Sequence, residues 1–165
     1  MIRNRHPEKT TLAIGDGAND VNMITAAHIG VGIAGMEGQQ AVRAADYGIG
    51  QFKFLKNLLF YHGREAYRRN TYAISYMFYK NILETFPIFF FGIFSSFSGT
   101  QIYNQTLYTL FNVAFTAFPV GWYSCFDYEY TKDVLLRRPF LYKIGMENKY
   151  FNKFVFWRWC TFALW

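Results

Sequence analysis

The chain has 165 residues, a formal net charge of +6, and 52% apolar and 22% aromatic residues. Its mean hydropathy is nevertheless near zero, so apolar and charged residues are segregated along the chain, which predicts membrane segments. The basic residues flank apolar stretches and form no groove-like cluster, which argues against nucleic acid as a partner and favours membrane topology.

Short apolar runs alternate with helix-like segments in residues 1–50. The expected elements are strands at Leu12–Ile14, Ile29–Ile33 and Tyr47–Ile49 and a helix at 39–45. This order predicts an alternating α/β arrangement. About fifty residues cannot bury a sufficient core alone, so we expect residues 1–50 to be the C-terminal part of a larger doubly wound domain. The chain also stops at Trp165 inside an apolar run, so we expect a fragment of a longer protein.

A glycine-rich turn with the sequence Gly-Asp-Gly-Ala-Asn-Asp follows the first strand at 15–20. Gly15 and Gly17 permit a tight or left-handed backbone, and the helical spacing after Asp20 places that residue at a helix start. Asp16 and Asp20 can therefore face one pocket, where they suit Mg²⁺ held jointly with a phosphate. Asn19 would donate to a phosphoryl oxygen. The alternative is a turn-forming Asp16 and an Asp20 that only caps the helix.

The segment at 15–20 resembles the last signature of the haloacid-dehalogenase-like phosphorylation domain of P-type ATPases. Cation pumps of that superfamily usually continue with Ala-Pro-Ala-Leu, whereas Val-Asn-Met-Ile follows here. Together with the segments at 30–33 and 35–41 and Phe-Tyr-Lys-Asn at 78–81, this continuation resembles the phospholipid flippase branch over nearly the whole chain.

The resemblance implies a set of ligands for the glycine-rich turn. Asp16 and Asp20 would bind the Mg²⁺ cofactor, Asn19 and Asp20 would bind phosphate of the nucleotide, and ATP would be the substrate. The aspartyl nucleophile of the family lies in an upstream Asp-Lys-Thr-Gly-Thr segment, so no catalytic residue is expected in this chain.

Residues 51–70 carry basic side chains among leucines and phenylalanines, a pattern typical of a membrane entrance. We expect a basic cytoplasmic stalk here. The segment His-Gly-Arg-Glu at 62–65 resembles the stalk sequence of the family, but a solvated charged face is the simpler interpretation.

Two apolar runs, 71–94 and 104–126, are long enough at ~1.5 Å per residue to cross a ~30 Å hydrocarbon core. The exoplasmic turn expected at 95–103 has no Lys or Arg, whereas the loop at 127–153 has six basic residues. The positive-inside rule therefore places this loop and the N-terminal part in the cytoplasm. A further transmembrane helix is expected to start within 154–165. The predicted fold class is the α/β end of a haloacid-dehalogenase-like phosphorylation domain followed by an all-α multi-pass transmembrane region.

Each predicted span contains one proline, Pro87 in the first and Pro119 in the second. A proline removes a backbone donor and bends the helix unless neighbouring groups compensate. Such breaks often line transport paths and are equally often ordinary kinks, so both interpretations stay open.

Lys80 lies about nine residues into the first span, roughly 14 Å by helical rise, where an ammonium costs at least ~2.5 kcal/mol. One interpretation is a structural ion pair with Glu84, one turn later on the same face. The other places Lys80 and Asn81 with Asn112 and Thr116 along a shared interior path. The second span has no carboxylate, so this set suits a lipid headgroup better than a dehydrated cation.

The resemblance also implies Lys80, Asn81, Asn112 and Thr116 as lipid-path residues of a flippase, an ATP-driven phospholipid transporter. Its partners would be the phospholipid substrate, the membrane and an accessory glycoprotein β-subunit. Three alternatives are a cation-transporting P-type ATPase, a membrane-tethered phosphohydrolase and a non-enzymatic helical membrane module with a decayed site. Lys80 at mid-membrane argues against the tethered phosphohydrolase, and the intact 15–20 segment argues against the decayed site.

Overall fold

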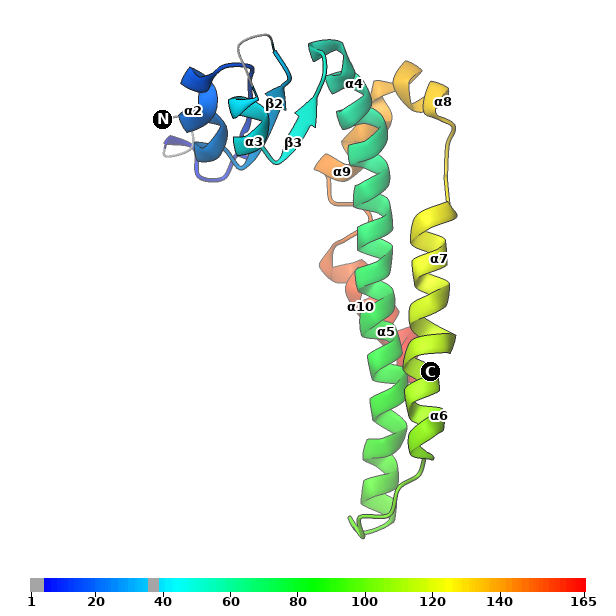
Figure 1. Cartoon of the computed structure of the whole chain (residues 1–165). Helices are drawn as coiled ribbons and strands as arrows, with labels where there is room; N and C mark the ends of the chain where they lie inside the picture. Colours follow the sequence, from blue (N-terminus) through cyan, green and yellow to red (C-terminus); the bar gives the residue numbers. More distant parts are fainter. Residues whose placement is uncertain (1–4, 36–38) are drawn as a thin grey trace. The chain divides into compact units, whose positions relative to one another are not determined.

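The computed structural model describes residues 5–35 and 39–165, which form two compact units, Met1–Leu59 and Phe60–Trp165 (Figure 1). Residues 36–38, which belong to one of the segments that carry the family resemblance, lie outside the described residues.

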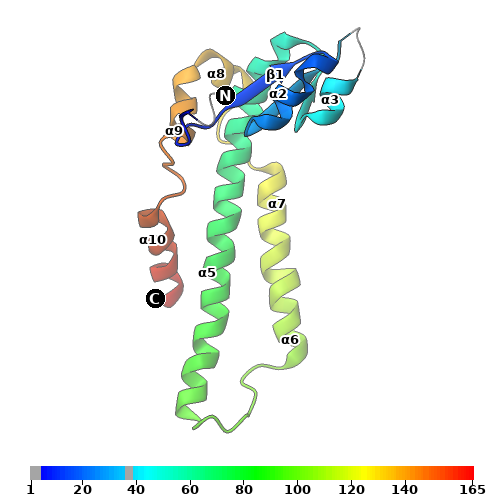
Figure 2. The same ribbon diagram turned by 90° about the vertical axis from the view of Figure 1, so that its left-hand side faces the viewer.

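The first unit contains a parallel three-stranded sheet in the order β1-β2-β3. Its strands are β1 (Leu12–Gly15), β2 (Ile29–Ile33) and β3 (Tyr47–Ile49), as the sequence predicts. Parallel strands need crossover connections, which contain the helices α2 (Val21–Ala26) and α3 (Gln40–Ala44) (Figure 2).

A small apolar core joins the sheet to its helices through Ile24, Val31 and Ala41, which are all buried. Glycine in the middle strand makes this packing close. A Cβ at Gly32 would lie 2.5 to 2.7 Å from backbone atoms of α3, so any side chain there would push α3 off the sheet.

Short irregular turns lead from β3 to a long helix. These are a 3₁₀ turn (Phe52–Phe54), α4 (Leu55–Asn57) and a π-helical turn (Leu58–Gly63). The long helix α5 spans Arg64–Phe94 and has 31 residues. The predicted boundary between stalk and span at 70/71 therefore falls inside one continuous helix, and the helix also continues through Pro87.

The second predicted apolar segment is a helix with a π-helical middle, consisting of α6 (Gln105–Leu110), a π segment (Phe111–Ala117) and α7 (Phe118–Phe126). Asn104 caps its start, because its side-chain oxygen accepts from the N–H of Thr106 at 2.9 Å. The π segment ends just before Pro119, which has no N–H to donate. Figures 1 and 2 show this helix running beside α5.

Four short helices follow, at α8 (Lys132–Arg137), a 3₁₀ turn (Pro139–Tyr142), α9 (Lys143–Met146) and α10 (Lys153–Leu164). Aromatic contacts attach α10 to α5: Trp159 lies 5.5 Å from Tyr72 and 5.9 Å from Tyr79 between ring centres. In residues 5–35 and 39–165, no helix combines the length and the apolar character needed to cross a membrane.

Candidate functional site

The glycine-rich turn leaves β1 and enters α2 through a 3₁₀ turn at Ala18–Asp20. The main-chain N–H of Asp16 donates to Oδ2 of Asp20 at 3.2 Å, so the Asp20 carboxylate lies against the start of the turn. A Cβ at Gly15 would lie 2.6 Å from the same oxygen. Glycine is therefore required for this close approach, which brings both aspartates to the carboxyl end of β1.

Asp20 occupies the N-cap position of α2, but its side chain makes no capping hydrogen bond. The alternative in which Asp20 serves only as a cap is therefore wrong, because its carboxylate bonds the turn instead. Asp16 and Asn19 are exposed, so both side chains are accessible to a ligand.

The donor chemistry of this turn fits Mg²⁺. Proteins usually hold Mg²⁺ through one or two carboxylates, with waters and substrate phosphates completing the shell. Among the described residues, no group of three or more His, Cys, Asp or Glu side chains could hold a metal ion. The two aspartates thus suit an ion shared with a phosphate and not an ion enclosed by protein ligands alone.

A second group of polar side chains joins α5 to the π segment. Nζ of Lys80 donates to Oδ1 of Asn112 at 2.7 Å and to Oγ1 of Thr116 at 3.4 Å. Thr116 is only 4% exposed, and its hydroxyl donates to the carbonyl of Asn112 at 2.9 Å. Asn81 is exposed and lies outside this hydrogen-bonded group, so the structure brings together three of the four side chains predicted to share an interior path.

Glu84 joins this group through Asn112, whose Nδ2 donates to Oε1 of Glu84 at 2.7 Å. In the part of the chain that the structure describes, the nitrogen of Lys80 and the carboxylate oxygens of Glu84 do not come within 4.0 Å, so the predicted direct ion pair is not formed. Instead, the carboxamide of Asn112 turns its oxygen toward the ammonium and its nitrogen toward the carboxylate. We call Lys80, Glu84, Asn112 and Thr116 the polar cluster.

A buried ion network lies at the start of α5, where the sequence predicted a solvated charged face. That interpretation is wrong for Arg64 and Glu65, which are 3% and 4% exposed. Glu65 accepts from Arg64 at 3.3 Å and from Arg68 at 3.1 Å. Arg68 also donates to Asp127 at 2.6 Å, and so the network ties α5 to the segment after α7.

The network favours the charged forms of both Arg68 and Asp127. Burial opposes the charge on Arg68, but hydrogen bonds to Asp127 and Glu65 outweigh it and raise the pKa of Arg68 above its usual value. The hydrogen bond from Arg68 in turn lowers the pKa of Asp127. The signal in the sequence was the pair Asp127 and Glu129 directly after an apolar run, which complements the arginines before the other run.

Two family models match the chain. The model described as phospholipid-translocating P-type ATPase C-terminal matches residues 42–165. The chain belongs to this family. A model of haloacid dehalogenase-like hydrolases matches residues 3–51, which confirms the class predicted for the α/β part.

Proteins similar to this chain carry names of the same family. They include phospholipid-transporting ATPase 6 of Arabidopsis thaliana, 51% identical over 144 residues and 87% of this chain. Phospholipid-transporting ATPase DRS2 of Saccharomyces cerevisiae is 46% identical over 155 residues, or 94% of the chain. Phospholipid-transporting ATPase ID of Homo sapiens is 48% identical over 149 residues, or 90% of the chain. The matched part is only 11 to 12% of the length of these relatives.

The two candidate sites of this phospholipid-translocating P-type ATPase chain fall in different family matches. The glycine-rich turn lies in the hydrolase-like match, and the polar cluster lies in the C-terminal match. The resemblance inferred from the sequence is therefore confirmed for both parts of the chain.

Proposed function

We propose that this chain is part of an ATP-driven phospholipid flippase, which moves lipid between the leaflets of a bilayer. Its membership of the phospholipid-translocating family and the names of its relatives support a lipid over a cation as the substrate. The remainder of such a transporter would supply the aspartyl nucleophile. An accessory glycoprotein subunit is a further proposed partner.

The observation that carries this proposal is the set of hydrogen-bond partners around the ammonium group of Lys80. Its ammonium is held by the neutral oxygens of Asn112 and Thr116 and not directly by a carboxylate. An ammonium has three N–H donors, so one remains for a ligand. Phosphate oxygens are suitable acceptors, because a charge-assisted hydrogen bond is stronger than a neutral one. Lys80, Asn112 and Thr116 thus serve the lipid path, with the exposed Asn81 beside them.

Segments 71–94 and 104–126 are proposed to lie in the bilayer, with a further helix starting in 154–165 and the N-terminal part in the cytoplasm. Large apolar side chains exposed along both segments support this placement. They include Ile74, Met77, Phe86, Phe89, Phe90, Leu107, Val113, Phe115, Phe118 and Trp122. Extended apolar surface of this kind marks contact with lipid or with another protein.

The glycine-rich turn is proposed to serve phosphoryl transfer. Asp16 and Asp20 would hold Mg²⁺, which supplies charge neutralisation at phosphoryl oxygens when it is bound. The N–H of Asp16 fixes one Asp20 oxygen, so the Asp20 carboxylate keeps its orientation. The exposed amide of Asn19 is available to donate to a phosphoryl oxygen.

The phosphoryl role is tested with Asp16→Asn in the complete transporter. We expect loss of Mg²⁺-dependent ATP hydrolysis by about 100-fold or more, as for removal of one electrostatic contact to a transition state. The matched control is Asp133→Asn, because Asp133 is an exposed aspartate on α8. Normal ATP hydrolysis by a well-expressed Asp16→Asn protein would refute the metal assignment.

The lipid role is tested with Lys80→Met, measured as lipid-stimulated ATP hydrolysis. The lipid concentration for half-maximal stimulation should rise about tenfold, the effect of one charge-assisted hydrogen bond, while phosphoenzyme formation stays unchanged. Lys132→Met is the control, because Lys132 is exposed at the start of α8. An unchanged lipid dependence in a folded Lys80→Met protein would contradict the proposal.

A further inference from the structure

A pocket of about 490 Å³ lies between α5 and the helix formed by α6 and the π segment. Its walls include Leu83, Pro87, Tyr108, Phe111 and Phe115, all without charge. Glu84 is the one charged side chain among the residues that line it. The pocket is therefore a mostly apolar space with a single carboxylate in its wall.

The Glu84 carboxylate has no cationic partner in the described chain within the 4.0 Å limit for an ion pair. Asn112 supplies one hydrogen bond at 2.7 Å and leaves the other acceptor sites of the carboxylate open. A half-buried carboxylate beside apolar surface is stabilised by a cation. The backbone offers a second oxygen that can accept from a cation. Pro87 has no N–H, so the carbonyl of Leu83 does not receive its usual helical hydrogen bond.

The remaining walls favour an organic cation over a metal ion. Tyr103, Tyr108, Phe111 and Phe115 surround the pocket with aromatic rings, and such rings attract ammonium and quaternary ammonium groups. Calcium and magnesium instead require several oxygen ligands or a shell of water. The chemistry matches an ammonium group that carries carbon substituents.

We propose that Glu84 and its pocket bind the ammonium group of a zwitterionic phospholipid headgroup, which makes Glu84 a specificity-determining residue against headgroups that lack a cation. The inference rests on the proposed function in one respect, namely that the ligand is a lipid. Lys80 and Glu84 lie on opposite sides of the Asn112 carboxamide. A zwitterionic headgroup carries a phosphate and an ammonium a few bonds apart, so it complements both charges.

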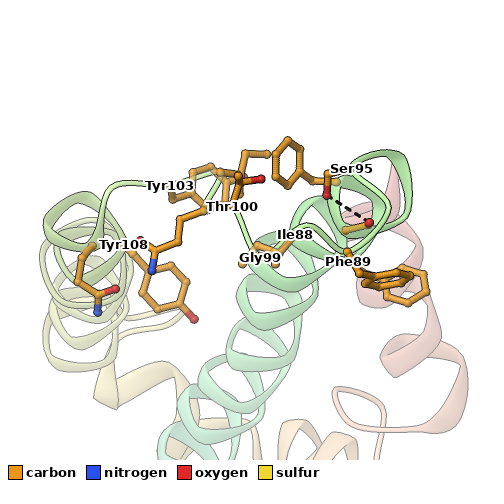
Figure 3. A pocket seen from close by; sticks show the side chains of 13 residues that line it. Ile88, Phe89, Ser95, Gly99, Thr100, Tyr103 and Tyr108 are labelled. Atoms are coloured by element: carbon orange, nitrogen blue, oxygen red, sulfur yellow. Dashed lines mark hydrogen bonds between the residues drawn. The ribbon is translucent and has the colours of Figure 1, made fainter.

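A second pocket, of about 500 Å³, adjoins the first at the end of α5 and shares Tyr103 and Tyr108 with it. Figure 3 shows these two tyrosines across the pocket from Ser95 and Phe89. Its lining includes polar groups such as Thr100 but no charged side chain. An uncharged and mostly apolar space therefore adjoins the pocket of Glu84 at the two shared tyrosines.

The test measures lipid association with the purified 165-residue chain in nanodiscs of phosphatidylglycerol, without ATP. Spin-labelled phosphatidylcholine, phosphatidylethanolamine and phosphatidylglycerol are compared by the fraction of motionally restricted label. We expect the choline and ethanolamine lipids to associate about tenfold more strongly than the glycerol lipid, the effect of one charge-assisted contact. In Glu84→Gln the preference should fall to about twofold or less. Glu147→Gln, at an exposed carboxylate paired with Lys149, should keep the full preference.

A second measurement needs no substitution and covers the case in which Glu84→Gln does not fold. A hydrophobic carbodiimide should modify Glu84 of the unaltered chain, as detected by peptide mass spectrometry. Phosphatidylcholine should protect Glu84, whereas phosphatidylglycerol should not. Equal protection by both lipids, or an unchanged headgroup preference in a folded Glu84→Gln chain, would overturn the proposal.

Simple cations separate a lipid site from an ion site. Tetramethylammonium should compete with labelled phosphatidylcholine, and potassium at the same concentration should not. Equal competition by potassium would make this an inorganic cation site and overturn the proposal. A chain that shows the headgroup preference while the transporter hydrolyses no ATP would disprove the flippase function but not the role of Glu84. Conversely, if lipid stimulated ATP hydrolysis by the transporter and Glu84→Gln kept the headgroup preference, the role of Glu84 would be disproved and the flippase function would stand.

Discussion

Exchanging the amide and the acid between positions 112 and 84 tests the polar cluster directly. In Asn112→Asp, a carboxylate oxygen replaces the Nδ2 donor that lies 2.7 Å from Oε1 of Glu84. The new charge is repelled by Glu84 and attracted by Lys80, whose Nζ lies 2.7 Å from the other oxygen. At an effective dielectric of ~20, these two terms are each about 6 kcal/mol and nearly cancel.

What remains is the lost hydrogen bond to a charged group, which is worth about 2 kcal/mol. We therefore expect Asn112→Asp to lower the free energy of unfolding by about 2 kcal/mol. Adding Glu84→Gln supplies a new N–H donor that faces the carboxylate at 112. It also removes the repulsion of about 6 kcal/mol between positions 84 and 112, while the attraction to Lys80 remains. The double variant should therefore recover at least the whole loss, which gives a coupling energy of more than about 2 kcal/mol.

The assay is denaturant unfolding of the full chain in detergent micelles, followed by tryptophan fluorescence. Asn104→Asp is the matched control on the same helix, since aspartate caps a helix as well as asparagine does and its effect should stay below about 0.5 kcal/mol. If the Asn112→Asp/Glu84→Gln protein were no more stable than the sum of its single variants predicts, Asn112 would not bridge the two charges.

Three further predictions concern the ion network and the glycine-rich turn. Arg68→Met should lower the free energy of unfolding by about 3 kcal/mol, since it removes a largely buried partner of two carboxylates, whereas the exposed Arg137→Met should change it by less than about 0.5 kcal/mol. Gly15→Ala should speed hydrogen exchange of the β1 amides, because the new Cβ displaces the neighbouring carboxylate, whereas Gly50→Ala, with no contact nearer than 4.0 Å, should not. The hydrogen bond from Arg68 lowers the pKa of Asp127 below its usual value of 3.8. The stability that the Asp127 carboxylate contributes is therefore present above pH 3.8 and is lost as the pH falls through its pKa in the folded chain. Asp127→Asn should flatten the fall of the unfolding free energy between about pH 5 and 2.

The parts of the structure that depend on local pattern could be predicted from the sequence. The three strands follow from short apolar runs separated by glycine and helix-like segments. The approach of Asp16 and Asp20 also has a local cause, because they lie only four positions apart and a glycine removes the steric obstacle. The meeting of Lys80 with Asn112 was predictable as well, since a basic group in an apolar helix needs a polar partner.

The parts that depend on distant partners could not be predicted. Arg64 and Glu65 form a regular charged surface pattern in the sequence. Their burial depends on a network that includes Glu129, 65 positions from Arg64, and Asp127, 59 positions from Arg68. Helical spacing suggested a direct contact between Lys80 and Glu84, because it holds no information about a side chain inserted from another helix. The placement of 71–94 and 104–126 in a bilayer stays a prediction.

The π segment at Phe111–Ala117 holds one residue more than an α-helical path of the same rise, as the hydrogen bond from Phe118 back to Val113 shows. One residue of an α-helix corresponds to a rotation of about 100°. The surplus residue therefore sets the angular phase between α6 and α7. Moving it along the chain past Asn112 would rotate that side chain by about 100° relative to α6 and separate it from both of its charged partners. Asn112 makes both of its 2.7 Å hydrogen bonds only while the surplus residue stays at its present position. The rotation of α7 relative to α6 and the hydrogen bonding of the polar cluster therefore change together.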